Sequence, residues 1–155
     1  MAKEIERKFL VDKEKLPPLS NPQHIIQGYI PSPEATVRVR VSNDKAFLTL
    51  KGKTKGITRS EFEYPISLAD AKAMLEELCV KPYIQKRRYL IPYEGHTWEL
   101  DIFEGHNEGL IVAEIELSSE DEVFSKPVWV KEDVSNDKRY KNSYLVYKHH
   151  LEKGL

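Results

Sequence analysis

Charged and apolar residues alternate along much of the chain, and this alternation predicts β-strands. In residues 36–41, valines alternate with Arg38 and Arg40, so a strand would carry the valines on one face and the arginines on the other. Further strands are expected at residues 4–11, 25–30, 46–51, 58–64, 83–92, 97–103 and 110–118. Asn43 and Asp44 form a turn signal that predicts a hairpin. The expected fold class is therefore α+β and mainly β.

One segment has the apolar spacing of a helix. Ser67 and Asp70 resemble a capping box at its start, and its apolar stripe is Leu68, Ala71, Met74, Leu75 and Leu78. We expect this stripe to pack against the core, with Cys79 beside it as a buried small residue.

The remaining segments give weaker patterns. Three prolines between residues 13 and 23 predict a connecting loop. A short acidic helix is expected at residues 119–124, and a strand fragment follows at Pro127. The C-terminal helix is expected to pack through Tyr144, Tyr147 and Leu151.

Composition narrows the class of protein. The chain has 155 residues, of which 40% are hydrophobic and 32% charged, as expected for a single domain over residues 1–155. Cys79 is the only cysteine, which excludes an intrachain disulfide and a thiolate zinc site, so a reducing cytoplasm is expected. The net charge of −1 and the short apolar runs favour neither a nucleic acid nor a membrane as partner.

Charges on the predicted strands are grouped by sign. The acids are Glu4, Glu6, Glu61, Glu63, Glu99, Asp101, Glu114 and Glu116, and the bases are Lys8, Arg38, Arg40, Lys51, Lys86 and Arg88. A sheet with one solvated face explains the alternation. It does not explain the grouping, because like charges two residues apart on one strand repel each other.

A closed barrel with these charged faces inside accounts for both features. About eight short strands suit closure, which removes the sheet edges, and the interior of such a barrel can hold one small ligand. Buried charges must be paired or must bind ions. Carboxylates suit Mg²⁺ or Mn²⁺, while arginine and lysine bind phosphate, so a short chain of phosphates is the expected ligand. Lys51-Gly52-Lys53-Thr54 is no Walker A loop, because Phe47 stands where its first glycine is needed.

The ordered set of motifs resembles the CYTH-domain proteins of the triphosphate tunnel metalloenzyme superfamily, especially the small bacterial members. The hallmark is Glu4-Ile5-Glu6-Arg7-Lys8. It is followed in order by Arg38-x-Arg40, a strand ending at Lys51, Glu61-x-Glu63, Lys86-x-Arg88, Glu99-x-Asp101, Glu114-x-Glu116 and the segment from Asp137 to Asn142. The resemblance covers essentially the whole chain.

The resemblance implies an eight-stranded antiparallel tunnel with a charged interior and a few helices packed outside. It implies metal-dependent hydrolysis of inorganic triphosphate, in which a water attacks a terminal phosphorus. Glu4, Glu6, Glu114 and Glu116 would be the main ligands of Mg²⁺ or Mn²⁺, with Glu61, Glu63 and Asp101 as lesser candidates. Arg38, Arg40, Lys51, Lys86, Arg88 and Arg139 would bind phosphates, and Lys8 and Lys51 would orient or activate the water.

Three other functions stay open at this point. One is an adenylate cyclase of the same superfamily, and another is hydrolysis of nucleoside or thiamine triphosphate. The third is a polyphosphate-binding module without catalysis, which would not need the carboxylate pairs. The sequence also leaves the oligomeric state open, a homodimer included.

Overall fold

The computed structural model describes residues 3–146, and strands dominate this part of the chain. The strands are β1 (Lys3–Val11), β2 (Gln23–Ile30), β3 (Thr36–Ser42), β4 (Lys45–Lys51), β5 (Thr58–Ile66), β6 (Ile84–Tyr93), β7 (His96–Glu104), β8 (Ile111–Glu116) and β9 (Val130–Asp133). The α-helices are α1 (Leu68–Glu77) and α2 (Asn142–Leu145), and the 3₁₀ turns are η1 (Lys13–Lys15), η2 (Gly105–Asn107) and η3 (Lys138–Tyr140).

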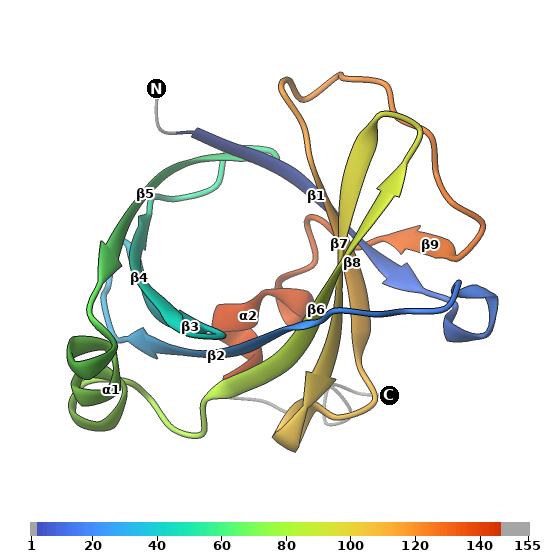
Figure 1. Cartoon of the computed structure of the whole chain (residues 1–155). Coiled ribbons are helices and arrows are strands. Elements are labelled where there is room, and N and C mark those ends of the chain that lie inside the picture. The colour runs from blue at the N-terminus through green and yellow to red at the C-terminus, as the bar shows by residue number, and fades with distance from the viewer. Residues whose placement is uncertain (1–2, 147–155) are drawn as a thin grey trace.

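Eight of the strands form a closed antiparallel barrel (Figure 1). Their order is β5-β4-β3-β2-β6-β7-β8-β1, and β1 returns to pair with β5. The closing ladder joins Lys3 to Ser60, Glu4 to Arg59 and Ile5 to Thr58. Strand β9 pairs with the far half of β1. The mainly β, eight-stranded closed barrel predicted from the sequence is thus confirmed.

Helix α1 covers part of the outer surface of the barrel. Ser67 caps it by accepting a hydrogen bond from the backbone N–H of Asp70, as predicted. Ala71 and Leu75 pack with Cys79 on the outward valine and alanine side chains of β3 and β4. The outer residues of the predicted stripe do not pack on the sheet, since Leu68 is 36% exposed and Leu78 is 54% exposed. The reason is that the ten-residue helix presents only a narrow face to the sheet.

A loop covers the outer face of β1, β7 and β8. Its Phe124 and Trp129 pack on Phe9 and Trp98, with ring centroids of Trp98 and Trp129 separated by 5.7 Å. The predicted acidic helix at residues 119–124 is wrong. Glu122 accepts hydrogen bonds from the backbone and hydroxyl of Ser118, so its carboxylate stabilises a turn instead of a helix.

The barrel interior is apolar at one end. The inward side chains of Tyr29, Ile84, Phe103 and Val112 pack there around Leu145 and Val146, which are almost fully buried. The C-terminal segment therefore enters the barrel through Leu145 and Val146, while the predicted packing residue Tyr144 is 37% exposed. Tyr147 and Leu151 lie outside the described residues. The charged interior that the sequence predicts thus occupies only part of the barrel's length.

No helix in residues 3–146 is both long enough and apolar enough to cross a membrane.

Gly28 on β2 lies where α1 packs most closely on the sheet. A Cβ atom at this position would come within 2.9 Å of both Cys79 Cβ and Leu75 Cδ2. We expect Gly28→Ala to lower the free energy of unfolding by about 1–3 kcal/mol through overpacking, measured by urea denaturation. Gly52→Ala is the control, because its nearest contact would be at an ordinary 3.6 Å. Equal stability of the two variants would contradict this account of the α1 contact.

Candidate active site

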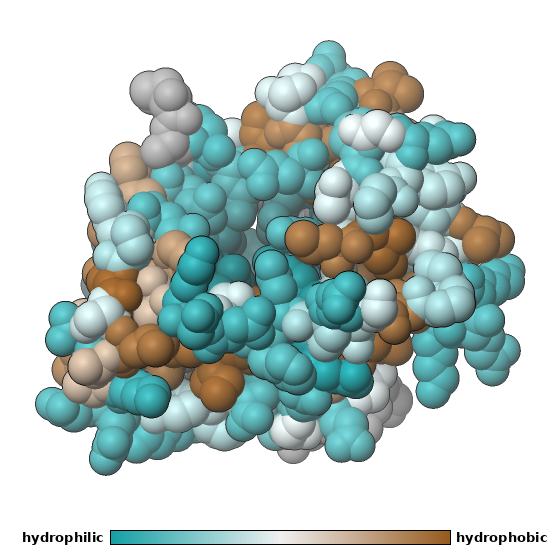
Figure 2. Space-filling view, viewed as in Figure 1, coloured by the Kyte–Doolittle hydropathy of each residue, from teal (hydrophilic) through white to brown (hydrophobic). Residues whose placement is uncertain are grey.

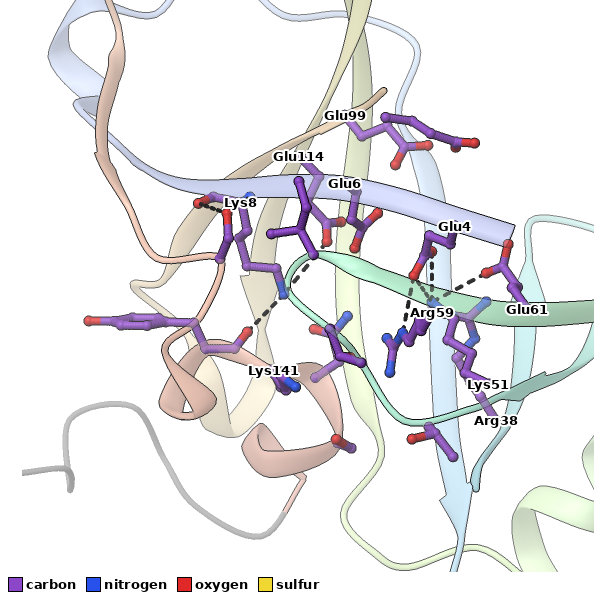
Figure 3. Close-up of a pocket in the computed structure, with 18 of the residues that line it drawn as sticks. Glu4, Glu6, Lys8, Arg38, Lys51, Arg59, Glu61, Glu99, Glu114 and Lys141 are labelled. Atoms are coloured by element: carbon purple, nitrogen blue, oxygen red, sulfur yellow. Dashed lines mark hydrogen bonds and ion pairs between the residues drawn. The ribbon is translucent and has the colours of Figure 1, made fainter. Parts of the chain in front are cut away.

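A polar cavity of about 210 Å³ occupies the charged part of the barrel interior. Figure 2 shows it as a hollow surrounded by hydrophilic residues, and Figure 3 shows its side chains. The inward residues of β1 begin the lining: Glu4, Glu6 and Lys8, as the alternation predicted. Residues from the other predicted strands complete it, together with Tyr140, Lys141 and Asn142 from the C-terminal segment.

Acidic and basic side chains line different walls of this cavity. Acids come mainly from the neighbouring strands β1, β7 and β8: Glu4, Glu6, Glu99, Glu114 and Glu116. Bases come mainly from β3, β4 and β6: Arg38, Arg40, Lys51 and Arg88. In the order of the eight-stranded barrel, β3 lies across from β8 and β4 across from β7. The arginines of β3 therefore lie across the barrel from the carboxylates of β8. Arg88 on β6 lies beside the acidic strand β7, and Lys51 contacts Glu4 and Glu61, so acids and bases also meet within the cavity.

Glu4 is held by two cations. Lys51 Nζ lies 2.9 Å from Oε2 and 3.2 Å from Oε1 of Glu4, and Arg59 Nε lies 3.2 Å from Oε1. Burial alone would raise the pKa of Glu4, but Lys51 and Arg59 outweigh it and lower that pKa. Lys51 also contacts Glu61 at 3.3 Å. Glu4 is therefore ionised and fully charge-paired.

Glu6 and Glu114 form the opposite case, because two carboxyl groups meet. Burial, and then repulsion from Glu114 and Glu4, raise the pKa of Glu6 well above its ordinary value. Burial would also raise the pKa of Glu114, but Lys8 and Arg88 lower it well below the ordinary value. Lys8 Nζ lies 3.6 Å from Glu114. The pKa values of the two groups are therefore shifted in opposite directions, and Glu6 is the more easily protonated of the two.

Arg88 is fixed in place by a buried carboxylate. Asp101 accepts from Nε and Nη2 of Arg88 at 2.8 and 2.9 Å, a bidentate arrangement. Lys86 Nζ contacts the same carboxylate at 2.8 Å. Burial lowers the pKa of Lys86 to about 7, although Asp101 opposes this shift. The other side of Arg88 faces the cavity, where it contacts Glu99 at 3.3 Å and Glu114 at 3.4 Å.

The arginines of β3 complete the basic wall. Arg38 donates to Thr49 at 3.1 Å and pairs with Glu63 at 3.3 Å. Arg40 donates from Nε to Gln27 at 2.8 Å. Burial, and then repulsion from Arg38 and Arg88, lower the pKa of Arg40 to about 10. An anion entering the cavity would relieve this repulsion.

Most of the predicted site residues line the cavity, and three do not. Lys86 and Asp101 are each 1% exposed and lie behind Arg88, outside the lining. Arg139 lies outside it as well, because it forms an exposed pair with Asp137 at 2.8 Å. The packing of the C-terminal segment, which no alternation pattern specifies, decides where Arg139 points.

Four charged cavity residues lie outside the predicted set of site residues: Glu99, Arg59, Asp137 and Lys141. Glu99 and Arg59 could have been found, since each lies two residues from an assigned position on its strand. For Lys141 the sequence offered no comparable signal, because its segment is not a regular strand.

The donor chemistry of the cavity suits a hard divalent cation. In residues 3–146, no group of three or more Asp, Glu, His or Cys side chains is already drawn together as a metal site. Nevertheless, Glu6 and Glu114 are buried close together, and their repulsion contributes to the raised pKa of Glu6, so a divalent cation bound by both carboxyl groups would be favourable. The cavity acids offer only oxygen ligands, the type that Mg²⁺ and Mn²⁺ prefer.

Known proteins are similar to this chain over nearly its whole length. A family model, the CYTH domain, matches residues 2–144. An inorganic triphosphatase of Acetivibrio thermocellus is 50% identical over 147 residues, which cover 94% of each chain. An inorganic triphosphatase of Nitrosomonas europaea is 37% identical over 152 residues, covering 92% of this chain and 96% of that protein. The crystal structure of the inorganic triphosphatase NE1496 is similar with a TM-score of 0.66 and 32% identity, covering 93% of this chain and 97% of that one. This chain belongs to the CYTH domain family.

Proposed function

We propose that this protein is a metal-dependent inorganic triphosphatase. The observation that carries the proposal is the cavity inside the closed barrel, in which the basic side chains of β3 and β4 face the acidic side chains of β7 and β8. Such a cavity suits a compact polyanion that brings divalent cations with it. The two inorganic triphosphatases with 50% and 37% identity support the same substrate. The family match supports one domain for the chain, and the lone Cys79 supports a reducing cytoplasm as its location.

Each wall has its own task in this proposal. Glu4, Glu6, Glu114 and Glu116 would hold Mg²⁺ or Mn²⁺, with Glu61, Glu63 and Glu99 nearby. A bound ion would neutralise negative charge on the phosphate oxygens. Arg38, Arg40 and Lys51 bind the phosphates from the opposite wall, and Arg88 binds them from its place beside the acidic strands. Arginine suits this task because its planar guanidinium can contact two phosphate oxygens at once.

Hydrolysis needs a water aligned with the terminal phosphorus. The water forms the new P–O bond and gives up a proton to a phosphate oxygen or to solvent. The bond between that phosphorus and the bridging oxygen breaks, so that orthophosphate and pyrophosphate are released. We assign orientation of the water to Lys8, which lies on the acidic wall within 3.6 Å of Glu114. Lys51 on the opposite wall would bind phosphate and could help orient the water, since it reaches Glu4 on β1.

In this proposal Lys86 and Asp101 do not contact the substrate and act on it only through Arg88. Both lie behind Arg88 and outside the cavity lining. Asp101 fixes the guanidinium plane, and Lys86 balances the charge of that carboxylate. We therefore assign them the positioning of Arg88, in place of the direct phosphate and metal contacts expected from the sequence.

Substrate preference is tested by phosphate release from tripolyphosphate, ATP, pyrophosphate and thiamine triphosphate, each with Mg²⁺, Mn²⁺ or EDTA. We expect turnover of tripolyphosphate to exceed the others and to vanish in EDTA. Preferred hydrolysis of a nucleotide, or formation of cyclic AMP from ATP, would overturn the proposal. Binding of tripolyphosphate without turnover would instead identify a polyphosphate-binding module.

Glu114→Gln tests the acidic wall. The substitution keeps the size of the side chain and removes the charge that we assign to the metal, so kcat should fall by at least about 100-fold. Glu104→Gln is the matched control, because Glu104 lies on the same sheet, pairs with Arg87 outside the cavity and should have nearly normal kcat. Equal activity of the two variants would argue against a role for Glu114 in the reaction.

The raised pKa of Glu6 predicts a pH dependence of metal binding. Because the pKa of Glu6 is raised, a cation that binds there must displace a proton, and its affinity should rise as pH rises toward that pKa. Titration calorimetry with Mg²⁺ in two buffers of different ionisation enthalpy should detect proton release. Glu6→Gln should abolish the release. Proton-independent binding in the unmodified protein would contradict the assignment.

A further inference from the structure

Arg59 on β5 is a cavity residue with a single ion-pair partner among residues 3–146. That partner is Glu4, whose Oε1 lies 3.2 Å from Arg59 Nε. The two residues face each other in the short ladder that closes the barrel. The contact uses Nε alone, so the two terminal nitrogens of the guanidinium take no part in it. The side chain is 21% exposed, and it can be reached from the cavity.

Glu4 does not depend on Arg59 for neutralisation. Lys51 contacts both of its carboxylate oxygens, at 2.9 and 3.2 Å. The ladder between β1 and β5 also fixes the backbone of Glu4 without any help from the Arg59 side chain. The contact between Arg59 and Glu4 can therefore be given up at little cost to the fold.

Further cations gather near Arg59. Lys8 and Lys141 also line the cavity, and Figure 3 shows both on the same side of β1 as Arg59. Burial, and then repulsion from Arg59, Lys138 and Lys8, lower the pKa of Lys141. Lys141 has no ion pair with a carboxylate in the described part of the chain. Glu4 and Glu114 offset the charges of Arg59 and Lys8, but they do not pair with Lys141, so an anion beside Lys141 would be favourable.

We propose that Arg59 is an exchangeable counter-ion. In the free protein it pairs with Glu4. Once a divalent cation takes Glu4, Arg59 turns to a phosphate of the substrate, beside Lys141. This rests on the proposed function, and it adds a phosphate subsite that assembles only after the metal has bound. Metal and triphosphate then bind cooperatively, because each favours the state in which Arg59 has left Glu4.

The test measures binding instead of turnover. Mn²⁺ affinity is measured alone by electron paramagnetic resonance. Affinity for imidotriphosphate, a non-hydrolysable analogue of tripolyphosphate, is measured by calorimetry in EDTA and with saturating Mn²⁺. In Arg59→Gln, we expect Mn²⁺ affinity to be unchanged or tighter and imidotriphosphate affinity in EDTA to be unchanged. With Mn²⁺ present, affinity for the analogue should fall by about tenfold, as for the loss of one charge-assisted contact.

Two further variants are measured alongside Arg59→Gln. Arg87→Gln removes an arginine on the outer face, where it pairs with Glu104 at 3.2 Å, and should match the unmodified protein in all three measurements. Arg59→Lys keeps the charge but loses the planar guanidinium group. The Mn²⁺-dependent gain, meaning the increase in imidotriphosphate affinity when Mn²⁺ is added, should therefore lie between the values for the unmodified protein and Arg59→Gln. Arg59→Lys also serves if Arg59→Gln does not fold.

Each competing role of Arg59 gives a different result. If Arg59 only orients Glu4, Arg59→Gln weakens Mn²⁺ binding and spares the analogue. If Arg59 binds phosphate permanently, the variant loses the same affinity in EDTA as in Mn²⁺. Either result would overturn the exchange, as would an unchanged Mn²⁺-dependent gain in both Arg59 variants. Absence of tripolyphosphate turnover by the unmodified protein would overturn the proposed function separately, because these binding measurements need no hydrolysis.

Discussion

The barrel can hold so many ionised groups only because its strand register places opposite charges across from one another. Lys51 faces Glu61, Glu4 faces Arg59, and Arg88 faces Asp101. A slip of one residue in any ladder would move every charge on that strand to the apolar outer face. The charged interior and the register therefore depend on each other, and neither is stable alone.

Two cross-strand pairs break this rule, and they lie together on the acidic wall. Glu6 faces Glu116 and Glu99 faces Glu114. Like charges directly opposite each other destabilise a sheet. Burial, and then repulsion from Glu114 and Glu4, also raise the pKa of Glu6 in this region. The repelling carboxylates thus lie together on the acidic wall, where a bound cation would relieve the repulsion. The charged residues around them are paired with opposite charges.

Support for the site comes from both sides of the barrel wall. Outside, the aromatic cluster around Trp98 and helix α1 hold the strands whose inner faces carry the charges. Inside, Leu145 and Val146 fill the apolar end of the barrel, and the preceding residues Tyr140 and Lys141 line the cavity. Lys8 donates to the backbone carbonyl of Tyr140 at 2.9 Å. The C-terminal segment is consequently part of the site and part of the core.

The sequence by itself determined which side chain of each strand faces inward. A strand repeats every two residues, so the alternation predicted which residues share a face, and the grouping of charges in a closed barrel predicted that the faces of Glu4, Arg38 and Glu114 point inward, as they do. The tertiary structure decided where the charged cavity ends and which cations reach it. Lys86 and Asp101 lie behind Arg88 because apolar side chains fill the barrel at their level, and Arg139 points away while Lys141 points in. These outcomes depend on which distant segments meet, and that is a matter of packing between elements, which no local periodicity encodes.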